Sequence, residues 1–122
     1  MATLTPTITL SSTDLSTDTL SVNLTDSLSV LGEVHIIRKK LSTTAALILD
    51  ASEHNKCYVL LNNTSTASAE IVTIEESEGG QEHMFLGAGE WAWFPWASAV
   101  DLLADSASGT PTLEVMIFEA TA

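Results

Sequence analysis

The sequence predicts an all-β protein, an antiparallel β-sandwich or barrel with about eight to ten short strands and little helix. The main observation is the alternation of apolar and polar residues along Leu20–Val30 and again along Leu113–Ile117. This period of two places alternate side chains on one buried sheet face. Turn-forming residues also recur every eight to twelve positions, roughly the spacing expected of a sandwich. Met116 and Phe118 have the opposite parity in the last run, which predicts a strand that is covered on both faces or lies at a subunit contact.

Between these two runs lie short segments rich in β-branched or aromatic residues, each bounded by turn chemistry. The expected strands are Val34–Leu41, Ala45–Leu49, Cys57–Leu61, Ala69–Ile74, His83–Leu86, Trp91–Trp96 and Val100–Leu103. The expected reversals are Asn62–Ser65, Glu78–Gln81, Gly87–Glu90 and Ser106–Gly109, where asparagine or glycine permits tight turns. The segment Leu41–Glu53 is the best helical candidate. Its β-branched residues favour a strand instead, with a turn near Ser52–Asn55.

The first 19 residues differ from the rest, because serine or threonine occupies almost every second position. The main apolar side chains there are Leu4, Ile8 and Leu10. Such a segment cannot form a core alone. We expect residues 1–19 to add to the sandwich as an edge strand or to project as an arm that pairs with a neighbouring subunit. Residues 20–122 are expected to form one sandwich domain.

The charge distribution limits the classes of partner. The chain of 122 residues has a net charge of −12, and its second half, from residue 62, holds ten acids and no base. Nucleic acid is an unsuitable partner because phosphate binding needs a Lys/Arg surface. No apolar run approaches the roughly 18 residues of a membrane span, and the start of the chain does not resemble a signal peptide. We therefore expect neither a nucleic-acid nor a membrane partner.

Three of the four basic residues are contiguous, at Arg38, Lys39 and Lys40. Charged residues on a strand discourage unwanted sheet-to-sheet pairing, which is one interpretation. The other is an anchor for an acidic partner surface. The sequence leaves both open.

All three tryptophans occur within the six residues Trp91–Trp96. Strand alternation sends Trp91 and Trp93 to one face, and Phe94 and Trp96 to the other. One face is expected to fill the core. The other is expected to form an oligomer interface or a sugar-stacking platform, because a large exposed apolar patch marks an interaction site.

No arrangement of residues indicates catalysis or a cofactor. His35, His54, His83 and Cys57 match no zinc spacing, and Cys57 lies in an apolar run without a nucleophile elbow. Several glutamates surround the expected turn in Glu75–Glu82. Clustered carboxylates can hold calcium, but alternate strand residues here would point to opposite faces of the sheet. We expect no enzymatic activity and no cofactor.

The second half of the chain resembles small structural proteins of tailed bacteriophages. In those proteins a strand ending in L-x-N is followed by a turn, a strand, an L-x-x-G-E corner, an aromatic strand and a closing strand. The matching segments cover about half of the chain and are Tyr58–Thr64, Ala69–Val72, Phe85–Pro95, Val100–Ala104 and Leu113–Glu119. This resemblance implies a jelly-roll-like sandwich and a role in the virion, and it transfers no catalytic residue.

Together these observations predict a non-enzymatic virion protein, most simply a decoration or cement protein on the capsid surface that contacts the major capsid protein as a homotrimer. The candidate interface residues are Trp91, Trp93, Phe94, Trp96, Arg38, Lys39, Lys40, Leu4, Ile8 and Leu10. The alternative is a receptor- or carbohydrate-binding sandwich in a tail or fibre, with the tryptophans as its platform.

Overall fold

The computed structural model describes residues 2–14, 20–76 and 81–121, and these form eleven strands and no helix. The all-β prediction is therefore confirmed. No helix in the described part of the chain is long and apolar enough to cross a membrane. The strands are β1 (Ala2–Leu4), β2 (Thr7–Ser12), β3 (Leu20–Thr25), β4 (Leu28–Lys40), β5 (Ala46–Leu49), β6 (Cys57–Asn63), β7 (Val72–Glu75), β8 (Glu82–Leu86), β9 (Trp91–Trp96), β10 (Leu102–Ser106) and β11 (Thr112–Ala120).

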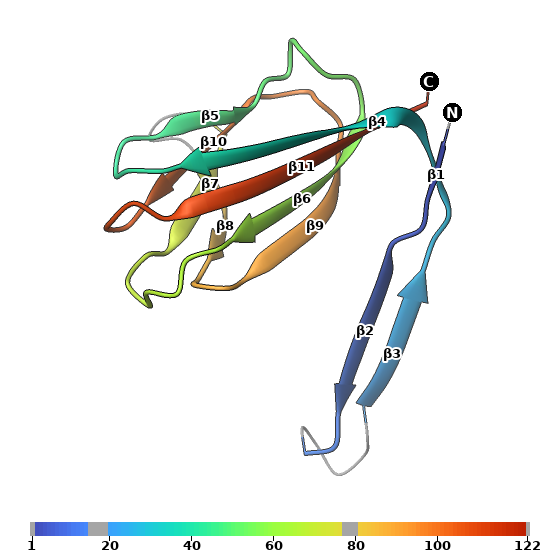
Figure 1. The fold of residues 1–122 in the computed structure, drawn as a ribbon, viewed down its shortest axis with the longest axis horizontal. Coiled ribbons are helices and arrows are strands. Elements are labelled where there is room, and N and C mark those ends of the chain that lie inside the picture. The colour runs from blue at the N-terminus through green and yellow to red at the C-terminus, as the bar shows by residue number, and fades with distance from the viewer. Residues whose placement is uncertain (1, 15–19, 77–80, 122) are drawn as a thin grey trace.

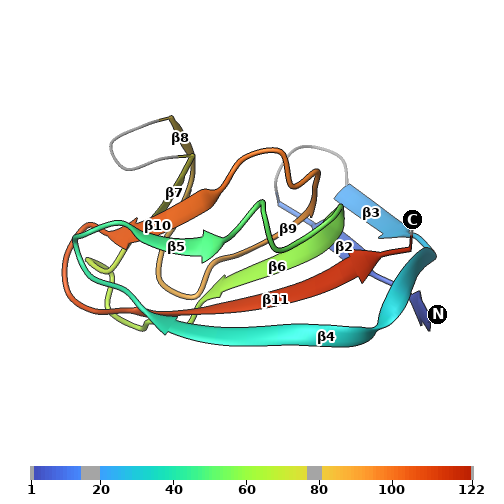
Figure 2. The ribbon, with the colours of Figure 1, turned by 90° about the horizontal axis from the view of Figure 1, so that it is seen from above.

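Strands β4 to β11 form a jelly roll of two facing sheets (Figures 1 and 2). One sheet has the order β1-β4-β11-β6-β9, and the other has the order β5-β10-β7-β8. The recorded strand pairs in both sheets are antiparallel. Apart from the β7–β8 connection, consecutive strands from β4 to β9 change sheet, as two interleaved Greek keys require.

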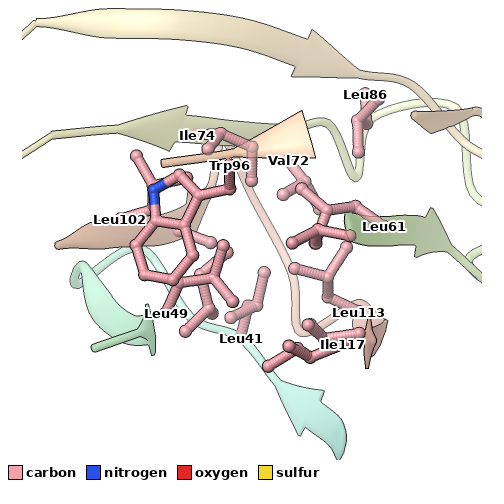
Figure 3. Close-up of a cluster of buried hydrophobic side chains, with 14 of the residues drawn as sticks. Leu41, Leu49, Leu61, Val72, Ile74, Leu86, Trp96, Leu102, Leu113 and Ile117 are labelled. Carbon is pink, nitrogen blue, oxygen red and sulfur yellow. The ribbon is translucent and has the colours of Figure 1, made fainter. Parts of the chain in front are cut away.

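The core lies between these sheets and follows from the period of two. In β6, and in β11 as far as Ile117, every second residue is fully buried, for example Val59 and Leu61 opposite Ile117 and Val115. These side chains belong to one cluster with Ile74 and Leu49 from the other sheet, and Figure 3 shows Leu61 and Ile117 within it. Trp96 fills one end of the same cluster and is 7% exposed.

The chain before β4 adds two features to the jelly roll. β1 pairs with the beginning of β4 at the edge of the five-stranded sheet, with Leu4 opposite Leu28. β2 and β3 pair only with each other and form a hairpin that projects from the sandwich (Figure 1). The amide of Asp26 donates to the carbonyl of Pro6 at the base of this hairpin (3.2 Å).

Several boundaries differ from the sequence expectation because local turns interrupt the alternation. The run Leu20–Val30 is broken at Asp26 and Ser27, where the hairpin ends and β4 begins. β7 begins at Val72 rather than at Ala69, since the amide of Glu70 donates to the carbonyl of Ala67 in a turn (3.0 Å). β10 runs over Leu102–Ser106 rather than Val100–Leu103. The expected turn at Glu78–Gln81 lies largely outside the described residues.

Candidate interaction surface

The side of the five-stranded sheet that is turned away from the core is apolar across four strands. We call this side the outer face. Opposite residues in an antiparallel ladder project from the same side of the sheet. The register places Ile36 opposite Met116, Met116 opposite Leu60, and Leu60 opposite Trp93. A second row contains Val34, Phe118, Tyr58 and Pro95. Ile36 is 55% exposed, and Trp91, at the end of β9, is 57% exposed.

Aromatic rings form the centre of the outer face. Tyr58 and Trp93 stack with ring centroids 6.3 Å apart and planes 13° apart. The ring of Phe118 also lies near Trp93, with ring centroids 6.1 Å apart and planes tilted by 56°. These contacts join rings from three strands, β11, β6 and β9, into one aromatic cluster.

The β2–β3 hairpin approaches these rings without closing over them. A groove of about 360 Å³ separates Ile8 and Leu24 of the hairpin from Tyr58, Trp93 and Pro95. A second groove, of about 240 Å³, continues from Leu4 and Ile8 toward Leu60, Trp91 and Phe118. The hairpin and the outer face thus present apolar surfaces to each other, with space between them.

The two faces of the hairpin differ in chemistry. One face is mainly apolar and carries the opposed pairs Ile8–Leu24, Leu10–Val22 and Ser12–Leu20. The other face carries hydroxyl and amide side chains, namely Thr7, Thr25, Thr9, Asn23, Ser11 and Ser21. Leu10 is 53% exposed and Leu24 is 62% exposed. An isolated two-stranded hairpin is marginal in water, so its apolar face is a surface that favours a partner.

The three contiguous basic residues lie at the end of β4, beyond the apolar part of the outer face. Arg38 projects from the outer face, where it forms an ion pair with Glu114 of β11 (3.1 Å). Lys40 has the same parity and is exposed. Lys39 lies opposite the buried Leu113 and is directed toward the inner side at the sheet edge.

The structure distributes the other candidate interface residues between surface and core. Trp91 and Trp93 lie on the outer face, whereas Phe94 packs against the core and Trp96 belongs to it. Leu4 and Ile8 line the grooves beneath the hairpin, and Leu10 lies farther along its apolar face. One face of the tryptophan segment therefore fills the core, and the other is available to a partner.

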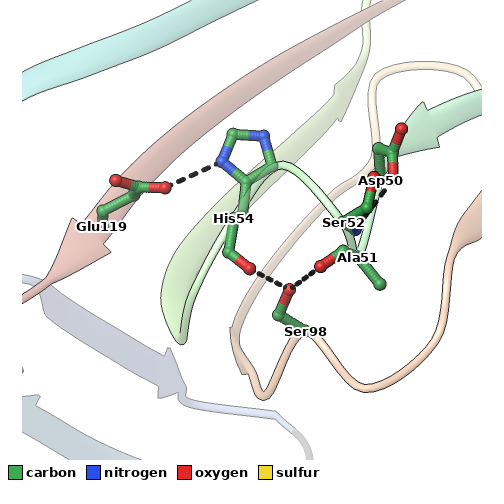
Figure 4. A network of polar contacts seen from close by, with 6 residues as sticks. All are labelled: Asp50, Ala51, Ser52, His54, Ser98 and Glu119. Atoms are coloured by element: carbon green, nitrogen blue, oxygen red, sulfur yellow. Dashed lines mark hydrogen bonds and ion pairs between the residues drawn. The ribbon is translucent and has the colours of Figure 1, made fainter.

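Ser98, His54 and Glu119 lie close together beside the loop after β5 (Figure 4). Their contacts connect loops to one another. His54 Nδ1 lies 3.0 Å from Glu119 Oε1. The hydroxyl of Ser98 points to the main-chain carbonyls of His54 and Ala51 rather than to the imidazole. This network fastens the turn after Asp50 to the loop after β9 and to β11. The side chain and amide of Ser52 lower the pKa of Asp50 in the same turn.

No group of three or more metal-ligating side chains is found among the described residues. In the glutamate-rich segment, Glu75 and Glu82 lie opposite each other on β7 and β8. Glu75 is buried, and residues 77–80 lie outside the described part.

Sequence reasoning missed the continuity of the outer face. Val34 and Ile36 were expected only as strand residues, yet they adjoin Phe118 and Met116. The role of Asn63 was also missed. It is fully buried, and its Nδ2 donates to the carbonyls of Glu70, Leu86 and Gly87 at 2.9, 3.0 and 3.1 Å. Asn63 alternates in step with the core-facing residues of its strand, and this position was the sequence signal that could have indicated its role.

Comparison with known proteins connects this fold to one solved structure. No family model and no curated protein matches the chain. Among solved structures, the fold is similar to that of a protein from Bacillus endospore appendages, which are described as a family of disulfide-linked pili. The two chains are 16% identical, and the match covers 76% of this chain and 88% of the other, with a TM-score of 0.55. At this identity the likeness establishes a shared fold.

Proposed function

We propose that the protein is a non-enzymatic structural subunit that acts by associating with further copies of itself. The observation that carries this proposal is the outer face, an apolar surface that spans four strands, with Ile36 and Trp91 more than half exposed. Soluble proteins rarely expose such a continuous patch unless it binds a partner. The shared fold with a pilus protein supports the same role.

The assembly that we propose is a bacteriophage head, with the protein as a decoration or cement subunit on the capsid surface. This finer role rests on the resemblance of residues 57–119 to small virion proteins. The strongly acidic second half also suits a surface that must stay soluble until it meets its binding site. The partners would be two further copies in a trimer and the major capsid protein.

A pilus-like filament is the second candidate, and the fold of the endospore appendage protein favours it. Those pili are disulfide-linked. The present sequence has one cysteine, Cys57, which is fully buried in β6. A filament of this protein would therefore be held by non-covalent contacts, and the apolar outer face would supply them.

Light scattering on the full chain and on two matched variants tests the proposal. Ile36→Asp places a charge on the outer face, and Leu47→Asp places one on an exposed leucine of the other sheet. We expect the wild-type protein to associate, Ile36→Asp to weaken association at least tenfold, and Leu47→Asp to leave it unchanged. A trimer that binds heads favours decoration, whereas open polymers favour a filament. A wild-type protein that stays monomeric at every concentration would contradict self-association.

A further inference from the structure

We propose that the apolar face of the β2–β3 hairpin docks on the outer face of a second copy of this chain, with Asp14, just beyond β2, next to Arg38 and Lys40. This inference rests on the proposed function and adds the contact that would join the subunits. It assigns a donor element and an acceptor surface to the same chain. The contact is heterologous, since a different surface is used on each copy.

The donor is the hairpin, whose apolar face is incompletely covered. Only its base approaches its own body, where Ile8 and Leu24 border the 360 Å³ groove. Leu10 and its partner Val22 lie one pair farther toward the tip and line neither groove beneath the hairpin. The opposite face offers hydroxyl and amide groups that water solvates well. The hairpin therefore has one face suited to a protein partner and one suited to solvent.

The acceptor is the part of the outer face that the hairpin of the same chain leaves open. It consists of Val34 and Ile36 on β4 with the basic residues Arg38 and Lys40 beyond them. These two cations have outer-face parity, and no ion pair is recorded for Lys40 within the described ranges. Because Arg38 is already paired with Glu114, Lys40 is the cation at this end of the outer face that attracts an acidic group.

The hairpin supplies such a group just beyond β2. Asp14 follows this strand, and its carboxylate accepts a hydrogen bond from the hydroxyl of Ser12 (2.9 Å), which holds it close to the end of β2. An apolar face that is followed by an acid thus matches an apolar face that is followed by Lys40 and the Arg38–Glu114 ion pair. Both the pairing of apolar surfaces and the order of charges are complementary.

The match cannot be made within one chain. The hairpin is attached where β4 begins, and Lys40 lies at the other end of this strand of 13 residues. At about 3.3 Å per residue, β4 spans about 40 Å. The six-residue strands of the hairpin reach only about half that length. Figure 1 also shows the hairpin directed away from the end of β4. A second copy is therefore the occupant that satisfies both surfaces.

The first test compares two variants on opposite faces of β2 in the full-length protein. Leu10→Asn polarises the apolar face, and Thr9→Asn introduces the same side chain on the hydroxyl face. We expect Leu10→Asn to weaken self-association about tenfold and Thr9→Asn to leave it within about twofold of wild type. Equal effects of the two variants would overturn the inference. Circular dichroism is the control that checks whether both variants retain the sandwich.

The second test exchanges the charges. Asp14→Lys and Lys40→Glu are each expected to weaken association several-fold, because each creates a like-charge contact. The double variant restores the attraction with its sign reversed, and we expect association within about twofold of wild type. Asp14→Asn and Lys40→Gln serve as charge-neutral controls. Additive losses in the double variant would overturn the proposed contact.

Cysteine cross-linking separates this inference from the proposed function. A mixture of Asp14→Cys and Lys40→Cys proteins is expected to form dimers with a short bifunctional thiol reagent, while Cys57 stays buried and unreactive. A wild-type protein that associates while the mixture gives no such dimers overturns the hairpin contact and leaves the structural role intact. A wild-type protein that never associates overturns both.

Discussion

Asn63 shows how a single buried polar residue can organise several loops. Its side-chain amide donates to three carbonyls, and its Oδ1 accepts from the amide of Ser65 (3.1 Å). Its own carbonyl accepts from the amide of Gly89 (3.0 Å). These bonds connect the turn after β6 with the turns before β7 and β9. A buried donor set of this kind is costly to remove, because the carbonyls are left without partners.

We predict that Asn63→Asp lowers the free energy of unfolding by about 3 kcal/mol, because a carboxylate cannot donate to the three carbonyls. Urea denaturation followed by tryptophan fluorescence measures the change. Asn23→Asp is the control, since Asn23 lies on the exposed hydroxyl face of the hairpin. It should alter stability by less than about 0.5 kcal/mol. Equal effects at the two positions would refute the role assigned to Asn63.

Gly109 is a second residue whose identity is dictated by its surroundings. Its φ is +69°, and a Cβ there would collide with Oε2 of Glu70. The same carboxylate accepts from the amide of Thr110 (2.8 Å), so it cannot move without losing that bond. Both the backbone conformation and the close approach require glycine.

Gly109→Ala should therefore destabilise the protein by about 2 kcal/mol or more. Gly32→Ala in β4 is the matched control, because nothing lies within 4 Å of its added Cβ and its φ is not positive. We expect that variant to be neutral or stabilised by up to about 1 kcal/mol. Thermal unfolding of the pair measures the difference, and a neutral Gly109→Ala would show that the loop has other conformations open to it.

Burial, and to a lesser extent the charge of Glu119, raise the pKa of the Cys57 thiol to about 11 from 9.0. A raised pKa in the folded state favours the neutral thiol there. The resulting stabilisation is fully present below pH 9.0 and is lost as the pH rises toward 11.

We therefore predict that the stability difference between wild type and Cys57→Ala narrows from pH 8 to pH 11, because only the wild type has this thiol. Denaturation at a series of pH values measures the difference. A constant difference would contradict the raised pKa. A thiol reagent should also react with the native protein far more slowly than with the unfolded protein.

At the scale of elements, β4 is the strand that the sandwich covers least. Its inner-parity residue Ile37 is still 42% exposed, and β1 pairs only with Leu28–Val30 along its free edge. Residues beyond Val30 thus present an open edge. Basic residues on such an edge discourage uncontrolled pairing, which agrees with one interpretation of Arg38–Lys40. The same residues serve as the acceptor in the proposed hairpin contact, so the two interpretations are compatible.

The register of β1 predicts that the hairpin can be removed without disturbing the jelly roll. Leu4 lies directly opposite Leu28, so replacing residues 5–27 with Asn-Gly would join β1 to β4 through a two-residue turn. We expect cooperative unfolding within about 1 kcal/mol of wild type, because the core cluster lies entirely beyond residue 40. Denaturation measures this, and light scattering should show that association is lost. Loss of folding would show that the hairpin is integral to the sandwich.

The elements were predictable where alternation and turn chemistry agreed. The strands at Trp91–Trp96 and at Cys57–Leu61 were expected almost as observed, since each has a clear period and a turn on both sides. The hairpin was not predicted, although Ile8 and Leu10 alternate with Thr7 and Thr9. The pattern does not show which segment pairs with β2, because a two-stranded hairpin has no buried core of its own.

At the scale of the whole molecule, charge opposes association. Each copy carries a net charge of −12, so copies repel one another at low ionic strength. The proposed contact contributes only a few complementary charges, and its main contribution is apolar. Salt screens the long-range repulsion more than it weakens a short-range apolar contact.

We therefore predict that self-association strengthens as NaCl is raised from about 20 mM to about 0.5 M, over which the Debye length falls from about 20 Å to below 5 Å. Sedimentation equilibrium across this range measures the effect. A contact driven mainly by Asp14 and Lys40 would instead weaken with salt. That outcome would contradict the claim that the main contribution of the proposed contact is apolar.

By itself, the sequence determined the all-β class, the inward residues of strands such as β6 and β11, and most turns, because these depend on neighbours within a few positions. Tertiary structure alone decided which face of the tryptophan segment enters the core, with Trp96 inside and Trp91 outside. It also decided that Ile36, Leu60 and Trp93 share one surface. Alternation tells which side chains of a strand share a face, whereas strand order and the covering of each face depend on contacts between residues far apart in the chain.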